Sequence, residues 1–517
     1  MPRASEDAVV IGAGHNGLVA ATQLARAGLR VRVLEARGVV GGAARTEHPF
    51  QRAPGLGVSS GAYLVGLIPP ELIRLLGANL PLVRRDPHYF LPTLDTRYLL
   101  LGSDAADVRR QCEAFFSRED ADAVDALTRE IAAIRDDIGP SWLDEPLSAE
   151  DTAARYVRPA LRQVFLDLVT HPVEDYLRRF NFRSDLLLAM FAVTDGFSGL
   201  TAGFGMRGTG MNFLVHNMCR LPGADGTWMI PRGGMGAVTR ELARLATARG
   251  AVIDTGAEVA RIVVSGGRVT GVAMADDRVI DTAVVVSAVD PFRMRALVGA
   301  DEFPAAFNAR LDAMRRPGTT LKVNLAFDRL PVFTCLPEDR GQFNGTVHLL
   351  PQGPDPIEEI RRAFAAVQAG RLADFPTIEW YTQTTVDPSL RDEAGRHSGA
   401  LFVEWVPYEL ASGSWEDAEP GYVRHLLSIL DRFAPGASDA VVDTFTLTPP
   451  KIEQHFGMTG GHIHHIDNSF GFDQRMPYRT PVAGLYACSA GCHPAGSVIG
   501  AAGYVGANRV LTDIGKA

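Results

Sequence analysis

Residues 8–17 read Ala-Val-Val-Ile-Gly-Ala-Gly-His-Asn-Gly, a short apolar run followed by three glycines in the spacing G-x-G-x-x-G. This pattern is typical of the first strand, turn and helix of a dinucleotide-binding unit. Gly12 permits the tight turn, Gly14 lets the backbone approach a pyrophosphate, and Gly17 lets the helix pack closely against the sheet. The amides at the helix N-terminus then bind the pyrophosphate. The stretch predicts an α/β fold of the Rossmann type.

The next residues fit the same unit. A helix is expected over residues 18–27, because apolar residues recur there at helical spacing, and Gly28 is placed to end it. Residues 29–34 predict a second strand, which delivers Glu35. The Glu35 carboxylate can accept hydrogen bonds from both hydroxyls of an adenosine ribose, and it repels the extra phosphate of NADP. These residues indicate FAD or NAD; the alternative is an ordinary βαβ turn with a solvated Glu35.

The choice between FAD and NAD depends on residues 41–46, which read Gly-Gly-Ala-Ala-Arg-Thr. A plain NAD domain does not need this run, whereas small residues let the chain lie along a bulky ligand such as a flavin. Arg45 would place a fixed cation near the pyrophosphate or the flavin, although an exposed loop arginine is the alternative. This run favours FAD.

Residues 12–17, 34–37 and 41–43 together resemble the N-terminal motif of the phytoene desaturase-like FAD-dependent oxidoreductase superfamily. The resemblance implies that residues 231–288 return the chain to the flavin domain, with a backbone contact to adenine at Val259. It also implies FAD-binding residues at Gly12, Gly14, Gly17, Glu35, Ala36, Arg37, Gly41, Gly42, Ala43, Arg45, Val259, Gly491, Gly496, Ser497 and Val498.

The C-terminal residues 480–503 resemble the C-terminal flavin motif of the same superfamily. An apolar strand, a glycine turn and a helix predicted to start near Ser497 would aim free amides at the flavin, which favours its anionic reduced form. A similar helix in an unrelated domain is the alternative. Residues 208–216, 232–238 and 460–465 resemble most those of the subgroup of pyridine nucleotide-disulfide oxidoreductase domain-containing protein 2.

One departure from the superfamily concerns residues 493–497, His-Pro-Ala-Gly-Ser, where members often carry a more glycine-rich run. His493 lies next to the predicted flavin-facing turn, and we name it as the candidate catalytic residue, which would donate to the flavin or relay a proton. A histidine that bonds only to backbone is the alternative.

The predicted fold class is α/β, with a Rossmann-type FAD-binding domain, similar to those of glutathione reductase and amine oxidases, and an interwoven α+β substrate domain. Helical spacing of apolar residues occurs in 105–116, 121–138, 149–167 and 417–433, whereas 322–327 and 401–405 are strand-like. We therefore assign residues 1–71, 226–300 and 470–517 to the FAD-binding domain, and residues 72–225 and 301–469 to the substrate domain.

Composition narrows the function. The chain has 517 residues, of which 46% are hydrophobic and 21% charged, and its net charge of −9 argues against a nucleic-acid partner. The N-terminus lacks the pattern of a secretory signal, and the longest apolar run, 186–193, is too short to span a bilayer. We expect a cytoplasmic protein. Peripheral contact with a membrane through residues 69–76 and assembly into a homo-oligomer both remain open.

The cysteines argue against redox disulfide chemistry, and the histidines do not favour a metal site. The five cysteines contain no CxxC pair, so a redox disulfide is not expected, and their scarcity fits a reducing compartment. His462, His464 and His465 lie close together, but only Asp467 is near enough in sequence to complete a ligand set. We expect no metal, and a substrate-facing or structural role for these histidines.

The sequence therefore predicts an FAD-dependent oxidoreductase, in which flavin N5 takes a hydride from the substrate. The resemblance to desaturases implies that this substrate is lipophilic, such as a polyene, terpenoid or acyl chain. Phe191, Phe197, Phe204, Met206, Phe213 and Met218 are candidates for a lipophilic pocket wall, and ordinary core and loop residues are the alternative. Oxygen or a quinone would accept the electrons. The alternatives are a flavin amine oxidase, a redox-neutral flavin isomerase and a non-catalytic, FAD-stabilised interaction protein.

Overall fold

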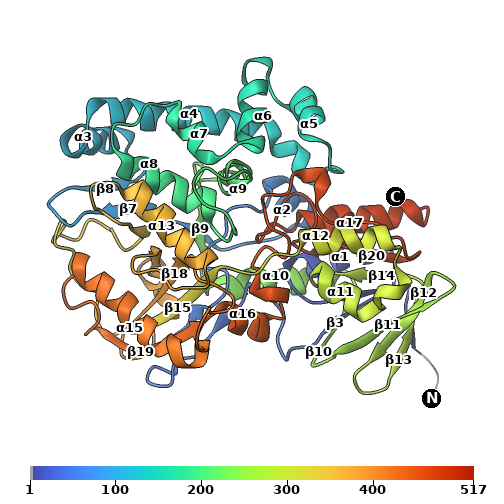
Figure 1. Cartoon of the computed structure of the whole chain (residues 1–517). Coiled ribbons are helices and arrows are strands. Elements are labelled where there is room, and N and C mark those ends of the chain that lie inside the picture. Colours follow the sequence, from blue (N-terminus) through green and yellow to red (C-terminus); the bar gives the residue numbers. More distant parts are fainter. Residues whose placement is uncertain (1–3, 517) are drawn as a thin grey trace.

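The computed structural model describes residues 4–516. The predicted dinucleotide-binding unit forms part of a five-stranded sheet (Figure 1). Every neighbouring pair of strands in this sheet is parallel, as the Rossmann-type prediction requires. The strand order is β10 (Val252–Thr255), β3 (Val31–Glu35), β2 (Ala8–Ile11), β14 (Val285–Ser287) and β20 (Leu485–Ala487).

The two faces of this sheet are covered differently. Val10 and Val33 point to one face and pack in the same apolar cluster as α1 (His15–Arg26), α10 (Met235–Ala248) and α17 (Ala501–Asp513). Val9 and Leu34, one position away, point to the other face and pack against a four-stranded sheet. That sheet contains β1 (Ala4–Ser5), β13 (Val279–Asp281), β12 (Arg268–Met274) and β11 (Val259–Ser265).

A seven-stranded sheet forms the centre of the second part of the chain (Figure 1). Its order is β19 (Val441–Leu447), β15 (Thr320–Phe327), β18 (His397–Glu404), β17 (Thr377–Tyr381), β16 (Thr346–Leu349), β7 (Tyr89–Pro92) and β8 (Tyr98–Leu101). Its strands come from the segments assigned to the substrate domain, and those of the five-stranded sheet come from the FAD-binding segments. The domain boundaries stay a prediction, and residues 1–3 and 517 lie outside the described residues.

One face of the seven-stranded sheet is apolar. Val323, Trp380 and Leu401 lie on this face and pack in one cluster with Leu426 and Leu430 of α15 (Trp415–Phe433), which confirms the helix predicted over 417–433. The residues that alternate with them along the strands point to the opposite face, which carries several polar side chains and lines the interior of the molecule. The sheet is therefore amphipathic, and its register determines which polar groups meet.

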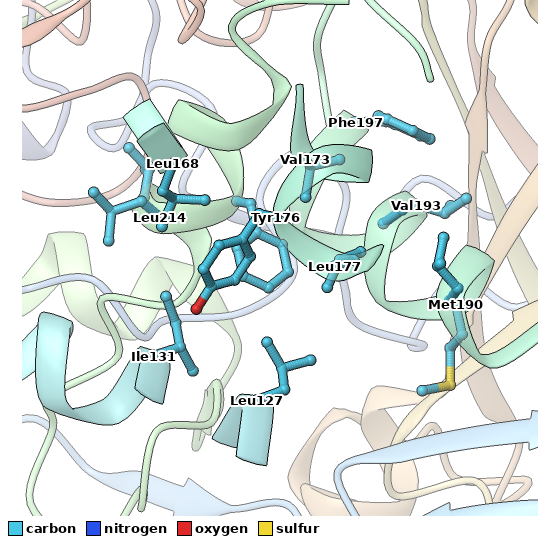
Figure 2. Packing of buried hydrophobic residues seen from close by; sticks show 14 of the residues in the cluster. Leu127, Ile131, Leu168, Val173, Tyr176, Leu177, Met190, Val193, Phe197 and Leu214 are labelled. Atoms are coloured by element: carbon cyan, nitrogen blue, oxygen red, sulfur yellow. The ribbon is translucent and has the colours of Figure 1, made fainter. Parts of the chain in front are cut away.

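A layer of helices lies above the seven-stranded sheet (Figure 1). Figure 2 shows Val193 and Phe197 of the π-helical turn η3 (Ala192–Phe197) packed among side chains that include Leu127, Tyr176 and Met190. This packing holds the turn in place. The layer consists of α3 (Ala105–Phe115), α4 (Arg118–Ile138), α5 (Ala149–Tyr156), α6 (Arg162–Thr170), α7 (Val173–Arg178), α8 (Asp185–Phe191), η3 and α9 (Thr209–His216).

Two helix boundaries differ from the sequence-based expectation. The helical pattern over 149–167 is divided into α5 and α6, because Pro159 has no amide hydrogen and Arg158 before it is extended. The C-terminal helix begins at Ala501 rather than near Ser497, since Gly500 has a φ of 79° that a right-handed helix cannot contain. Ser497 therefore lies in the loop before the helix.

The remaining elements connect these layers. Among residues 4–516, no helix combines the length and the apolar character needed to cross a bilayer. The connecting elements include β4 (Thr46–Glu47), β5 (Val58–Ser59), α2 (Pro70–Leu76), β6 (Leu82–Arg84), β9 (Met229–Pro231), α11 (Pro291–Val298), α12 (Ala305–Met314), α13 (Pro356–Gln368), α14 (Gln383–Val386) and α16 (Pro449–Phe456).

Candidate active site

A cavity of about 510 Å³ runs from the carboxyl ends of β2 and β3 to the polar face of the seven-stranded sheet. Ligands of open α/β sheets bind at this end of the strands. The cavity brings together most of the residues that the sequence nominated for FAD, namely Gly12, Gly14, Gly17, Glu35, Ala36, Arg37, Gly41, Gly42, Ala43, Arg45, Val259, Ser497 and Val498.

Glu35 is held in place by two backbone amides. The amide of Ala13 donates to Glu35 Oε2, and the amide of Arg37 donates to Glu35 Oε1, each at 2.9 Å. Each carboxylate oxygen keeps a further lone pair for a ribose hydroxyl. The contacts therefore orient Glu35 for the role that the sequence assigned to it.

The N-terminus of α1 has room for a pyrophosphate. Gly14 is its N-cap, no side chain among residues 4–516 caps it, and a Cβ built on Gly14 meets no atom within 4 Å. The first amides of an α-helix have no partner within the helix, and the space beside Gly14 is open. At Gly17, in contrast, a Cβ would lie 2.0 Å from the carbonyl oxygen of Gly12, so only glycine fits. The donors and the open space fit the pyrophosphate of FAD.

Arg45 is a buried cation and not an exposed loop residue. Its Nη2 lies 3.1 Å from Glu47 Oε1 and 2.7 Å from His455 Nε2, and its guanidinium lies 5.1 Å from the centroid of the Phe456 ring. Burial and the hydrogen bond from His455 act in opposite directions on Glu47, whose pKa is lowered to about 2. These contacts fix Arg45 in the cavity wall.

Three nominated residues do not line the cavity. His493 is buried, and its Nε2 lies 3.2 Å from the carbonyl oxygen of Ser141, while burial lowers its pKa to about 4. Gly491 and Gly496 also lie behind the cavity wall, and the amide of Gly496 donates to Asn468 Oδ1 at 2.7 Å. The structure therefore brings Ser497 and Val498 to the site, but not His493.

The other histidines have separate positions. His464 and His465 line the cavity, whereas His462 is buried with its Nε2 3.4 Å from Asp467 Oδ2. In the part of the chain that the structure describes, no three metal-ligating side chains come together as a metal site. The five cysteines are buried and unpaired, including Cys488 and Cys492.

The register of the seven-stranded sheet places a row of polar and aromatic groups on the face of the cavity. Lys322 of β15 is opposite Phe402 of β18, and Phe402 is opposite Glu379 of β17. In the next row, Tyr381 of β17 is opposite Thr346 of β16. Because side chains two residues apart share a face, both rows point the same way, and all five side chains line the cavity.

Lys322 is a buried lysine at this face. Its Nζ donates to the carbonyl oxygen of Gly61 at 2.7 Å, and it lies 4.1 Å from the centroid of the Tyr63 ring and 4.6 Å from that of Phe402. Burial lowers the pKa of Lys322 to about 7, although the charge of Glu379 acts in the opposite direction. The amine can therefore hold or release a proton near neutral pH.

Two carboxyl groups line the same part of the cavity as Lys322, next to the polar face of the seven-stranded sheet. We call this part of the cavity the chamber. Burial raises the pKa of Glu379 to about 7, and the Tyr381 hydroxyl donates to its Oε2. Burial also raises the pKa of Asp195 to about 7, with the charge of Glu379 as a second cause. Asp195 accepts a hydrogen bond from Asn217 Nδ2 at 3.0 Å and lies on η3, a π-helical turn of the kind often found at functional sites.

Sequence reasoning missed Lys322, Glu379 and Asp195. The strand over 322–327 was predicted, and it carries Lys322 and Asn324 two positions apart in an otherwise apolar run. Polar residues at this spacing in a buried strand indicate a polar sheet face. That signal identifies Lys322 as a candidate, but no local pattern shows that Asp195 lies in the same chamber.

The parallel sheet, the dinucleotide end of the cavity and the adjoining polar chamber define an FAD-binding oxidoreductase. A family model described as flavin containing amine oxidoreductase matches residues 17–355. The chain belongs to this family. The fold class, the FAD cofactor and the resemblance stated from the sequence are thereby confirmed.

Particular relatives agree with this assignment. The chain is 34% identical to pyridine nucleotide-disulfide oxidoreductase domain-containing protein 2 of Mus musculus, over 98% of this chain and 94% of the relative. It is 25% identical to a phytoene dehydrogenase of Streptomyces griseus, over 91% of this chain and 87% of the relative. A solved structure of a putrescine oxidase variant matches with a TM-score of 0.60 and 18% identity, over 99% of each chain.

Proposed function

We propose that this protein oxidises a carbon–hydrogen bond next to the basic nitrogen of a compact amine. The observation that carries the proposal is the pair of buried carboxyl groups, Asp195 and Glu379, in one chamber with the aromatic rings of Tyr63, Tyr381 and Phe402. Carboxylates and aromatic faces both attract a cation, and they do so most strongly where water is excluded. A protonated amine supplies that cation.

Lys322 provides the proton transfer that amine oxidation needs. An amine arrives as an ammonium ion and must lose a proton before a hydride can leave its neighbouring carbon. Neutral Lys322 accepts that proton at Nζ, and Asp195 and Glu379 stabilise the charge. We propose that the nominated residues from Gly12 to Val498 that line the cavity hold FAD. When bound, FAD supplies the acceptor for the hydride.

The test is anaerobic mixing of the FAD-loaded protein with a panel of primary, secondary and tertiary alkylamines, followed by the visible absorption of the flavin. We expect one amine class to bleach the flavin, and Lys322→Met to slow the bleaching while FAD stays bound. Lys451→Met is the matched control, because Lys451 is an exposed lysine paired with Glu419. Rapid bleaching by Lys322→Met would contradict the proton-accepting role.

Desaturation of a lipophilic substrate is the second candidate function. It is supported by the name of the Streptomyces relative, a phytoene dehydrogenase, and by apolar side chains such as Ile463 and Phe402 in the cavity wall. A polyene would give the polar groups of Asp195 and Glu379 no hydrogen-bond or charge partner from the substrate, so it makes no use of these two side chains. Bleaching by a polyene and not by any amine would favour this function; peroxide release on reoxidation would identify oxygen, rather than a quinone, as the acceptor.

A further inference from the structure

Arg85 is a fully buried arginine in the cavity wall, directly after β6, with 1% of its surface exposed. Its Nε donates to the carbonyl oxygen of Trp228 at 3.0 Å, and its Nη1 donates to Thr346 Oγ1 at 2.7 Å. Its Nη2 is buried and has no hydrogen-bond partner among the described residues. Two of the five N–H donors of the guanidinium are thus used, and both N–H groups of Nη2 stay without a partner on a side chain that lines the cavity.

The positive charge of Arg85 also lacks an ion-pair partner among the described residues. Among residues 4–516, no carboxylate forms an ion pair with it, and the carboxylate whose charge acts on it is Glu379, whose Oε2 already accepts from Tyr381. Arginine keeps its charge in proteins, and a buried charge needs a partner and hydrogen bonds. The other titratable groups whose charges interact with Arg85 are neutral at physiological pH, namely Tyr89, Tyr381, Cys219, His88 and His348.

We propose that Arg85 binds a carboxylate on the substrate, so that the substrate is an amine that also carries a carboxyl group. The flat guanidinium presents Nη2 to one carboxylate oxygen, and the Thr346 hydroxyl, held by Nη1, is available at the same edge. The amine part of this inference rests on the proposed function, with Asp195 and Glu379 at the nitrogen. The carboxylate part rests on Arg85 alone.

The experiment compares ω-amino acids, from β-alanine to ε-aminocaproate, with n-alkylamines of the same carbon number. The readout is the concentration of each compound that half-saturates flavin bleaching in the FAD-loaded protein. We expect the preferred amino acid to bind roughly 10- to 100-fold more tightly than its alkylamine, as a charge-assisted hydrogen bond predicts. Arg85→Gln removes this preference, and Arg85→Lys restores part of it.

Arg84→Gln is the matched control, because Arg84 is the neighbouring arginine, pairs with Asp225 and does not line the cavity. We expect it to keep the preference. FAD content and the unfolding midpoint of each variant report folding. Equal binding of the two series by the unmodified protein, or an undiminished preference in Arg85→Gln, would overturn the inference.

A second measurement needs no turnover and is made on the unmodified protein and on Arg85→Gln. Butyrate is titrated against the flavin absorption of each, with n-butanol as the uncharged control. We expect butyrate alone to perturb the spectrum of the unmodified protein, and the absence of that effect would contradict the anion site. If no amine bleaches the flavin but butyrate binds and requires Arg85, the proposed function fails and the anion site stands. If amines bleach the flavin without any dependence on Arg85, the anion site fails.

Discussion

Lys322 is buried, and at alkaline pH it is largely deprotonated in the folded protein. We consider its replacement by methionine. The pKa of Lys322 is about 7 in the folded protein, against 10.5 in an ordinary environment. The unfolded chain therefore binds the proton more tightly, and the resulting cost to the folded state is largest below pH 7 and fades as the pH rises toward 10.5. Methionine is free of this cost.

The magnitude follows from the two pKa values. At about 1.4 kcal/mol per pKa unit, the lysine costs the folded state about 3 kcal/mol at pH 8 and about 1.5 kcal/mol at pH 9.5. The lost hydrogen bond to Gly61 offsets about 1 kcal/mol of the gain at either pH. Both pH values lie above the pKa values of Asp195 and Glu379, so those groups change little between them.

The assay is the thermal unfolding midpoint of Lys322→Met and of the unmodified protein, measured by calorimetry at both pH values with excess FAD. We expect Lys322→Met to be the more stable protein at pH 8 and its advantage to shrink at pH 9.5. The exposed-lysine control, Lys451→Met, should show no such trend. An advantage that stays constant or grows with pH would refute the reasoning, because it would mean that Lys322 is protonated throughout.

Three further changes test other parts of the site. Glu35→Ala removes the carboxylate that faces the ribose, and should weaken FAD binding by roughly 10- to 100-fold in an equilibrium titration of the apoprotein; unchanged affinity would show that Glu35 does not contact the cofactor. Gly17→Ala puts a Cβ 2.0 Å from the carbonyl oxygen of Gly12 and should abolish FAD retention on purification, whereas Gly38→Ala, whose Cβ meets no atom within 4 Å, should retain it. Asp195→Asn should keep its FAD but need roughly tenfold more amine to half-saturate flavin bleaching, and equal half-saturation would exclude Asp195 from amine binding.

The cofactor half of the site could be predicted because its residues are close in sequence and each has a local signature. Gly12, Gly14, Gly17 and Glu35 occupy one βαβ unit, and the glycine spacing fixes their relation before any tertiary contact is known. Arg45 follows within the same segment. Such local constraints are visible in a single sequence.

The polar residues of the chamber, which would bind and deprotonate the substrate, could not be predicted in the same way. Arg85, Asp195, Lys322 and Glu379 come from a loop, a π-helical turn and two strands, and they meet only through the register of the seven-stranded sheet and the packing of the helices above it. Register is set by long-range pairing. His493 shows the converse, since its nearness to the flavin motif in sequence does not bring it to the cavity.

The most direct test of the central claim is the visible spectrum of the purified, FAD-loaded protein during anaerobic addition of amines and, separately, of polyenes. The account predicts that the cofactor released by heat is FAD and that an amine bleaches the bound flavin while polyenes leave it oxidised. Bound FAD that only a polyene bleaches would contradict the amine assignment, and a protein that cannot bind FAD would contradict the account as a whole.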